Sequence, residues 1–415
     1  MDKRILVISN EAFSDASSNG RTMKNLLLGF PKESLAQFYI HGTPDESVCA
    51  HYYGVSDSDA LRAFLHKKPL SQQKTSTVAA DHSGQKPKRS YRNLVLRNMI
   101  WQSMRWWTKE FDAFLEDFQP QVVLLQAGDA PFMYKIARKI AKRYGAKLLM
   151  FNTEHYVLKK RMYAPKPEDT MFWHNILMGS LKRQYRKFMN RVDLCVYGTE
   201  YLEQIYQERY PHPGKSIACY TGTDMQDCSG FAKQAQAFSL VYCGNLGVGR
   251  VPVLSMVAQT LKEVEPNAKL VIYGKFANEE DRRQLCAYEN VDFRGFVSYE
   301  EIPRALGEGS MVIHCENNDR LENLKTAFST KIADSLACGK PFLVVASREY
   351  PFVQYLADNH SAHIAQDPGE LSRILRLCIE DPAYRDQYIP NAKALACKNH
   401  SAMENSRKLM EILTQ

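Results

Sequence analysis

The chain has 415 residues, of which 45% are hydrophobic, so it is long enough to bury the cores of two or three domains. It holds no run of 18 apolar residues, which excludes a membrane-spanning helix, and its formal net charge is +8. Ten cysteines stand singly without a Cys-x-x-Cys pair. This pattern argues against a zinc cluster or a disulfide framework and indicates a cytoplasmic protein.

The positive charge is concentrated in the first half of the chain. Residues 1–235 carry 34 Lys and Arg against 23 Asp and Glu, a balance of +11, whereas the remainder carries 20 against 23, a balance of −3. This asymmetry suggests that the first half meets an anionic partner, such as a membrane surface, a phosphorylated lipid or nucleic acid.

Apolar runs and helical spacing alternate along the first half. The opening residues become polar too soon for a signal peptide and predict a first strand over 4–9. A polar loop over 15–20 and a helix over 22–30 follow. Further strands are predicted at 35–40, 121–126, 147–151, 192–197 and 216–220, with a helix over 131–144. Strands separated by helices predict a parallel sheet covered on both faces.

A basic region interrupts this alternation. Residues 67–91 are rich in Lys, Ser, Gln and Gly and predict a mobile surface loop, and the amphipathic stretch 93–118 after it contains Trp101, Trp106 and Trp107. Ten basic side chains in 66–110 against two acidic ones could rest on an anionic membrane leaflet. The alternative is that the tryptophans anchor the first domain's core. Nucleic acid is less favoured, because no recognised binding module frames the cations.

The second half repeats the same α/β alternation. A passage of small and polar residues over 227–237 is the best candidate linker. Strands are predicted at 239–243, 269–273, 291–294, 311–315 and 342–345, and helices at 251–264, 279–288, 299–306, 329–339, 371–378 and 403–413.

The short helix over 329–339 is one candidate site. Ser329 and Thr330 can begin it, Gly339 and Pro341 can end it, and a buried strand follows. The first N–H groups of a helix and its positive dipole end can bind a phosphate. Asp334, in the early part of the helix, could accept hydrogen bonds from a ribose, although the dipole would stabilise an aspartate there in any case.

A glycine loop is the second candidate site. The sequence from Leu240 to Arg250 predicts a strand that enters a loop containing Gly244, Gly247 and Gly249. Glycines allow backbone amides to approach a diphosphate, and an arginine can pair with it in bidentate fashion. The spacing differs from the Rossmann dinucleotide pattern. Because ligands of open α/β sheets collect at the carboxyl ends of strands, the two motifs together predict a site for a nucleoside diphosphate.

These motifs resemble those of GT-B glycosyltransferases, specifically the retaining family 4 that builds bacterial surface polysaccharides. The resemblance implies an α/β protein with two Rossmann-like domains facing a cleft. In the family pattern Gly-Arg-x-x-x-x-Lys-Gly, Gly244 matches the first glycine, Asn245 stands at the arginine position and Arg250 at the lysine position. The family's Glu-x7-Glu element falls on Thr326 and Asp334, so its ribose-binding carboxylate is present and the carboxylate near the transferred sugar is absent.

The resemblance implies how the site is assembled. Donor-binding residues would be Gly244, Asn245, Gly247, Gly249, Arg250, Ser329, Thr330, Lys331 and Asp334. Arg250 and Lys331 would also serve catalysis by neutralising the leaving diphosphate. Glu316 and Glu322 could replace the absent carboxylate, or could be solvated loop residues. Lys331 could equally extend to solvent.

The first half offers weaker candidates for the acceptor side. Asn19 and Gly20 follow the first strand, where the family has a glycine loop, but an ordinary strand–helix turn is as plausible. Glu154 and His155 follow another strand, at a segment where the family often places a histidine near the transferred sugar, and either could instead be an ordinary loop residue. The cations of 159–161 could bind phosphate or form a solvated face.

The sequence therefore predicts an acceptor-binding domain over 1–230, a donor-binding domain over 236–400 and a closing helix over 401–415. The expected function is transfer of a sugar from a nucleotide diphosphate donor to a glycan or lipid-linked glycan in polysaccharide biosynthesis. We expect no cofactor and no metal, since no Asp-x-Asp ligand pair occurs, and no nucleic acid partner. A cytoplasmic enzyme, peripheral at the inner membrane face, fits these expectations. A sugar-nucleotide epimerase and a non-catalytic nucleotide- or glycan-binding subunit remain as alternatives.

Overall fold

The computed structural model describes residues 3–15, 17–66, 90–158, 171–231, 237–247, 249–320 and 325–414. The chain divides into two compact units, of which unit 1 comprises residues 1–220 with 406–415 and unit 2 comprises residues 221–405. The division at residue 220 precedes the linker that composition suggested over 227–237. Residues 221–231 instead pack within unit 2, where the backbone N–H of Cys228 donates to the carbonyl of Cys338 over 2.9 Å.

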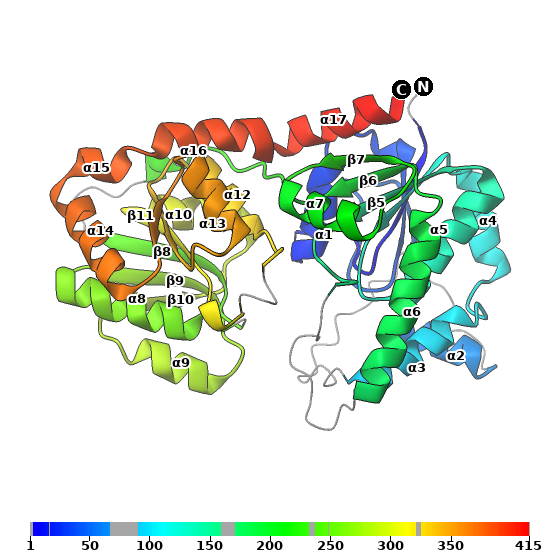
Figure 1. The fold of residues 1–415 in the computed structure, drawn as a ribbon, viewed down its shortest axis with the longest axis horizontal. Helices are drawn as coiled ribbons and strands as arrows, with labels where there is room; N and C mark the ends of the chain where they lie inside the picture. The colour runs from blue at the N-terminus through cyan, green and yellow to red at the C-terminus, as the bar shows by residue number, and fades with distance from the viewer. Residues whose placement is uncertain are drawn as a thin grey trace. The chain divides into compact units, whose positions relative to one another are not determined.

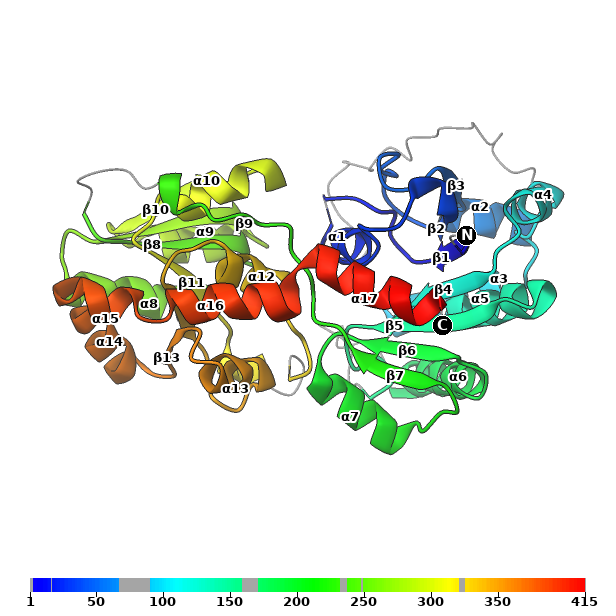
Figure 2. The same ribbon diagram turned by 90° about the horizontal axis from the view of Figure 1, so that it is seen from above.

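Unit 1 is built on a seven-stranded parallel sheet with the order β3-β2-β1-β4-β5-β6-β7 (Figures 1 and 2). Its strands are β1 (Ile5–Ile8), β2 (Leu35–Tyr39), β3 (His51–Gly54), β4 (Val122–Gln126), β5 (Lys147–Asn152), β6 (Leu194–Tyr197) and β7 (Lys215–Ala218). Its helices are α1 (Ser18–Leu26), α2 (Asp57–Phe64), α3 (Tyr91–Gln102), α4 (Lys109–Phe118), α5 (Pro131–Tyr144), α6 (Met171–Met189) and α7 (Glu200–Arg209), and the end of α17 (Ala402–Thr414) joins them.

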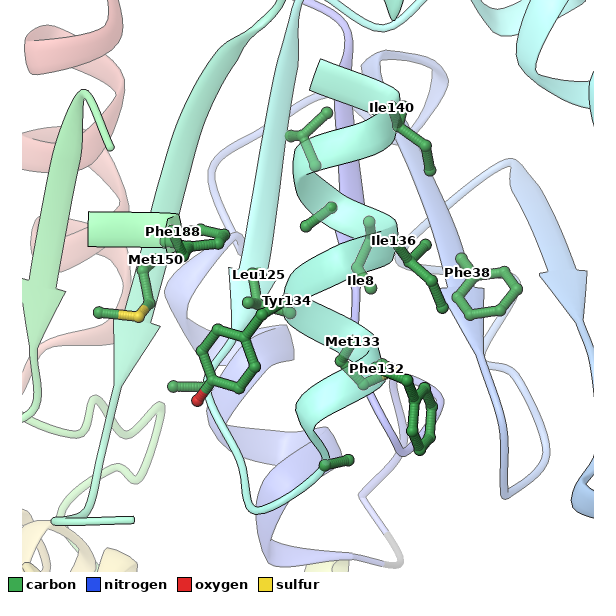
Figure 3. Packing of buried hydrophobic residues seen from close by; sticks show 14 of the residues in the cluster. Ile8, Phe38, Leu125, Phe132, Met133, Tyr134, Ile136, Ile140, Met150 and Phe188 are labelled. Atoms are coloured by element: carbon green, nitrogen blue, oxygen red, sulfur yellow. The ribbon is translucent and has the colours of Figure 1, made fainter. Parts of the chain in front are cut away.

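The strands of unit 1 form because apolar runs are buried on both faces of the sheet. Central strands β1, β2, β4 and β6 are buried at every position, as parallel strands between two helical layers should be. Helix α5 has the sequence signals that begin and end a helix. Pro131 is its first residue, and Gly145, whose φ of +61° suits a glycine, caps its C-terminus. Its apolar side packs on side chains from the sheet, including Ile8 and Leu125 (Figure 3).

The basic stretch that was expected to be one amphipathic segment is two helices, α3 and α4, separated by a turn in which Met104 has a φ of +59°. Trp101 and Trp106 are buried in the core, and the Trp101 ring stacks on Phe132 with centroids 4.8 Å apart. These tryptophans therefore anchor the core, which was the alternative considered, and they are not available to a membrane. The predicted loop over 67–91 lies, as far as residue 89, outside the described residues.

Unit 2 is built on a six-stranded parallel sheet with the order β10-β9-β8-β11-β12-β13. Its strands are β8 (Ser239–Asn245), β9 (Lys269–Lys275), β10 (Val291–Gly295), β11 (Met311–Cys315), β12 (Phe342–Val345) and β13 (His363–Ala365). Its helices are α8 (Val251–Val264), α9 (Glu279–Cys286), α10 (Ile302–Gly307), α12 (Thr330–Ala337), α13 (Pro351–Asp358), α14 (Pro368–Glu380), α15 (Pro382–Asp386) and α16 (Ile389–Leu395), and α17 begins in this unit.

Two helical layers cover the sheet of unit 2. Helices α8, α9 and α14 lie on one face, and α10, α12, α13 and α16 lie on the other (Figure 1). Helix α12 follows the carboxyl end of β11, which places its first turn at the edge where ligands of such sheets bind. Among the described residues, no helix is long and apolar enough to cross a membrane.

Candidate functional site

The predicted donor-site residues gather at the carboxyl edge of the sheet in unit 2. The parallel register of β8, β9 and β11 brings the ends of these strands to one edge. The glycine loop leaves that edge after β8, and the connection to α12 leaves it after β11. The two candidate motifs therefore lie in one place, although they are about eighty residues apart in the sequence.

Lys331 joins the two motifs directly. Its side chain crosses from the first turn of α12 to the glycine loop, where a Cβ atom added to Gly244 would overlap its Cε and Nζ. The Lys331 Nζ lies 5.5 Å from the centre of the Tyr242 ring in β8. Gly244 is therefore required by the close approach of the lysine, and the ammonium group stands beside the backbone that was predicted to receive a diphosphate.

The surroundings of Lys331 favour the neutral form of its amine. Burial and the nearby positive charge of Arg250 lower the pKa of Lys331 to about 7, although the charge of Glu316 acts in the opposite direction. A lysine in this state gains full charge when an anion arrives, because a negative neighbour favours the ammonium form. Such a perturbed group at the ligand-binding edge of an α/β sheet marks a candidate functional site.

Arg250 lies at the end of the glycine loop and makes contacts within unit 2. Its guanidinium is buried, donates through Nε to the carbonyl of Cys315 over 3.1 Å and through Nη1 to the carbonyl of Asn245 over 3.0 Å, and pairs with Glu316 through Nη2. With these contacts Arg250 joins the end of β8 to the end of β11, and its pairing with a diphosphate stays a prediction. Its hydrogen bond to the carbonyl of Asn245 holds the start of the glycine loop in place.

Glu316 is correspondingly not a free substitute for the family's missing carboxylate. It is buried against Arg250, and its Oε1 lies 3.3 Å from Nε2 of the buried His314. Burial opposes ionisation, yet the adjacent His314 and Arg250 lower the pKa of Glu316 to about 2. Burial also lowers the pKa of His314, which favours its neutral form. The other suggested substitute, Glu322, lies outside the described residues, and Thr326 is buried.

Asp334 faces the interior of unit 2. Its Oδ1 accepts a hydrogen bond of 2.6 Å from the hydroxyl of Thr223, and the carboxylate is buried. Residues three apart on a helix are neighbours, so Asp334 lies on the same side of α12 as Lys331. This hydrogen bond holds residues 221–225 against α12. Its role toward a ribose stays a prediction.

The remaining donor-site residues lie at the loop and at the helix start. Ser329 is the residue before α12, and its hydroxyl caps no backbone N–H of the helix. Thr330 is the first helical residue. The Asn245 side-chain oxygen accepts from the N–H of Gly247 over 2.7 Å, which closes the loop locally, and Gly249 has a φ of +78°. These positions leave the helix start and the glycine loop adjacent to Lys331.

Two residues at the same edge were not singled out from the sequence. Lys275 ends β9, and its Nζ lies 4.1 Å from the ring centre of Phe296, which follows β10 and is exposed. The backbone N–H of Leu246 in the glycine loop donates to the carbonyl of Lys275 over 3.1 Å. Their position after consecutive parallel strands was the available signal, because those strand ends share the ligand-binding edge.

The acceptor-side candidates lie in unit 1. Asn19 and Gly20 are in the first turn of α1 and not in a loop as expected, because the Ser17 hydroxyl caps the N–H of Gly20 over 3.0 Å. A Cβ at Gly20 would collide with the carbonyl oxygen of Ala12, so this glycine is needed for packing.

Glu154 and His155 follow β5, and His155 is buried. The Tyr206 hydroxyl holds this turn, since it donates to the carbonyl of Glu154 over 3.3 Å and accepts from the N–H of Val157 over 3.4 Å. The cations of 159–161 lie outside the described residues. Among those described, no three His, Cys, Asp or Glu side chains come together as metal ligands would.

The comparisons with known proteins agree with this architecture. Residues 254–411, less than half of the chain, match the family model described as glycosyl transferase-like. Sucrose-phosphate synthase from Thermosynechococcus elongatus superposes with a TM-score of 0.64 at 11% identity, covering 100% of this chain and 98% of that one. A structure of HepE from Anabaena with UDP and glucose gives 0.63 at 13%, covering all of both chains.

This protein has the GT-B glycosyltransferase fold. WaaG, a glycosyltransferase involved in lipopolysaccharide biosynthesis, is similar in the same way, with a TM-score of 0.61 at 12% identity and 99% coverage of both chains. A search of curated proteins by sequence finds no match. The two parallel α/β units expected from the sequence are thereby confirmed, while identities this low speak to the fold alone.

Proposed function

We propose that this protein is a glycosyltransferase that transfers a sugar from a nucleotide diphosphate-sugar bound at the carboxyl edge of unit 2. The observation that carries the proposal is the meeting of Lys331 with Gly244, which joins a cationic side chain, a glycine loop and a helix N-terminus at one edge. Each of these elements favours a phosphate, and together they suit a diphosphate. Similarity to HepE, solved with UDP and with UDP-glucose, makes UDP the first nucleotide to test.

The proposed roles follow from the geometry of unit 2. Lys331 and the N–H groups beginning α12 would stabilise the charge that develops on the leaving diphosphate, and stabilisation of this kind is usually the largest catalytic contribution. Asp334 would accept from the ribose while Thr223 holds it. Arg250 would act as a positioning residue, because its contacts with Asn245, Cys315 and Glu316 hold the glycine loop in place.

The finer assignments rest on the resemblance to family 4. Retention of anomeric configuration, independence of metal and a glycan or lipid-linked acceptor in polysaccharide biosynthesis are proposed on that basis. Glu154 and His155 of unit 1 are proposed to serve the acceptor side, and Asn19 and Gly20 to shape it. A carboxylate near the transferred sugar is not proposed, because Thr326 stands at that position.

The test is a thermal-shift panel of UDP-, GDP-, TDP- and CMP-sugars, followed by transfer from the stabilising donor to candidate glycans. We expect one nucleotide class to raise the melting temperature, and Lys331→Met to abolish that rise. Turnover should persist in EDTA, and loss of turnover that manganese restores would contradict metal independence. If no nucleotide shifts the melting temperature, the proposed site is wrong.

A non-catalytic nucleotide-binding subunit is the second candidate. Two observations favour it: the family's first carboxylate is replaced by the buried Thr326, and Arg250 is committed to internal contacts. Nucleotide binding without hydrolysis or transfer of the donor by the purified chain would support this candidate. Either activity would reject it.

A further inference from the structure

Two buried cysteines of unit 2 lie side by side, although they are 110 residues apart in the sequence. Cys228 belongs to residues 221–231, which we call the entry segment because the chain enters unit 2 through them, and Cys338 follows the last residue of α12. The backbone N–H of Cys228 donates to the carbonyl of Cys338 over 2.9 Å, and the Cys228 thiol donates to the same carbonyl over 3.1 Å. Spacing in the sequence gives no sign of this pair.

The backbone around the pair has the dimensions of a disulfide site. With ordinary bond lengths, the hydrogen bond of 2.9 Å keeps the two Cα atoms within about 7 Å of each other. Disulfides join residues whose Cα atoms lie roughly 4.4–6.8 Å apart. The adjacent residues are equally close, because a Cβ atom added to Gly339 would lie 2.4 Å from a carboxylate oxygen of Asp227. A sulfur–sulfur bond therefore needs no large movement of the backbone.

The two thiols differ in reactivity because each affects the other. The Cys338 thiol donates to the Cys228 sulfur and lowers the pKa of Cys228. The positive charge of Lys340 acts in the same direction, whereas burial and the charge of Asp227 oppose it. The same hydrogen bond, together with burial, raises the pKa of Cys338. Since the thiolate is the nucleophilic form, Cys228 is the sulfur that reacts first.

Burial limits which oxidants can reach the pair. The exposed fraction is 1% for Cys228 and 0% for Cys338. Asp227 and Ser229, on either side of Cys228 in the chain, are exposed, so the Cys228 thiol lies just beneath the surface of unit 2. A small oxidant such as hydrogen peroxide can enter when the entry segment opens briefly, whereas a bulky disulfide is excluded.

The pair stands at one end of the helix whose other end belongs to the candidate donor site. Helix α12 has eight residues, with Lys331 in its first turn and Cys338 directly after its last residue. Asp334 lies between them, where its carboxylate accepts from Thr223 of the entry segment over 2.6 Å and its carbonyl accepts from the N–H of Cys338 over 3.0 Å. The entry segment therefore contacts α12 both at Asp334 and at Cys338.

We propose that Cys228 and Cys338 form a reversible disulfide bond that fixes the entry segment on α12 and so regulates nucleotide binding at the proposed donor site. The regulatory part rests on the proposed function, whereas formation of the bond does not. In reducing compartments, disulfides of this kind are usually transient and sense the redox state. The oxidant is a peroxide and the reductant is a dithiol.

The reaction has two steps. The Cys228 thiolate attacks one oxygen of hydrogen peroxide, the O–O bond breaks, and the hydroxide that leaves takes up a proton to become water, so that Cys228 becomes a sulfenic acid. The Cys338 sulfur then attacks the Cys228 sulfur, the S–O bond breaks, and the hydroxide leaves as water with the thiol proton of Cys338. The two thiols together lose two electrons, which reduce one peroxide to two waters. A dithiol restores both thiols by exchange.

The test uses the full-length protein carrying Cys286→Ser and Cys397→Ser, because these two cysteines are exposed and would react on their own. After hydrogen peroxide, we expect the loss of two of the remaining thiols and a cross-linked Cys228–Cys338 peptide in mass spectrometry. Dithiothreitol should reverse both changes. Oxidation should raise the melting temperature by about 5 °C or more, since the bond closes a long loop. It should raise UDP affinity about threefold, because Asp334 is then held in place before binding.

Cys228→Ser and Cys338→Ser are the matched variants, since serine keeps a hydroxyl that can donate to the same carbonyls. Neither should change its melting temperature or UDP affinity after peroxide. In Cys338→Ser the reaction should stop at the sulfenic acid of Cys228, which dimedone labels, whereas Cys228→Ser should take up no label at Cys338. Cys195→Ala removes a buried cysteine of unit 1 and should respond to peroxide as the parent does.

Three outcomes would overturn the proposal. Peroxide could leave both thiols free, or the cross-link could join Cys228 to Cys243 of β8, whose thiol is also near it. The bond could also form without changing UDP affinity, which would exclude the regulatory role. If neither the reduced nor the oxidised protein binds UDP, the proposed function fails, while the cross-linked peptide still decides whether the bond forms.

Discussion

The lowered pKa of Lys331 predicts that the proposed nucleotide binding depends on pH. In the free protein the pKa of Lys331 is lowered to about 7 by burial and by Arg250, whereas an ordinary lysine has a pKa of 10.5. A bound diphosphate would favour the charged form and raise the pKa. The protein should therefore take up a proton on binding at pH above 7, and its affinity should fall as the pH rises.

The size of the effect follows from the two pKa values. If binding restores the ordinary value, the affinity falls by about 50-fold between pH 7 and pH 9, because the neutral form of the free protein must first be protonated. A partial restoration gives a smaller fall with the same sign. Below pH 6 the lysine is already charged in the free protein, so the affinity should change little for this reason.

Isothermal titration calorimetry with UDP can measure this effect directly. Titrations in buffers of different ionisation enthalpy should show about half a proton taken up at pH 7 and close to one at pH 8. Lys331→Arg is the matched variant, because arginine remains charged throughout this range. It should bind UDP with an affinity that is nearly constant from pH 7 to pH 9.

The reasoning is refuted if the parent protein shows a flat affinity profile. It is also refuted if Lys331→Arg retains the same slope, since the titrating group would then be another residue. Lys331→Met tests whether the lysine cation itself is needed for binding. This variant should bind UDP weakly at pH 7 and should take up no proton on binding, because the titrating group has been removed.

Three further predictions concern neighbouring residues. Gly244→Ala should lower UDP affinity at least fivefold, because the new methyl displaces the tip of Lys331, and should also lower the melting temperature, because the φ of +159° is unfavourable for a residue with a Cβ; an unchanged UDP affinity would contradict this. Arg250→Met should destabilise the fold by about 3–5 kcal/mol in urea denaturation, since it leaves Glu316 buried and unpaired, and adding Glu316→Leu should recover most of the loss. Asp334→Ala and Thr223→Val should each cost about 1–3 kcal/mol of stability, but only the former should weaken UDP binding; equal affinities would remove the carboxylate from the ribose site.

Much of the secondary structure was predictable because it depends on local patterns. The strands Met311–Cys315 and Phe342–Val345 and the helix Val251–Val264 lie where apolar runs and helical spacing predicted them. The short edge strand His51–Gly54 was missed, since it is half-buried and has no continuous apolar run. Helix α1 begins earlier than expected because Ser17 caps it, a signal hidden among other small polar residues.

By itself the sequence determined the two α/β units, the glycine loop and the short helix of the candidate donor site, because periodicity, glycines and capping residues act over a few neighbours. Only the tertiary structure decided which charges meet. Arg250 pairs with Glu316, which is 66 residues away in the sequence, and Asp334 accepts from Thr223, which is 111 residues away. Arg250 and Asp334 are therefore held inside unit 2, whereas the Lys331 side chain extends to the glycine loop. The burial of Trp101 and the exposure of Met99 and Phe172 were decided in the same way, because contacts between helices determine which side of each remains uncovered.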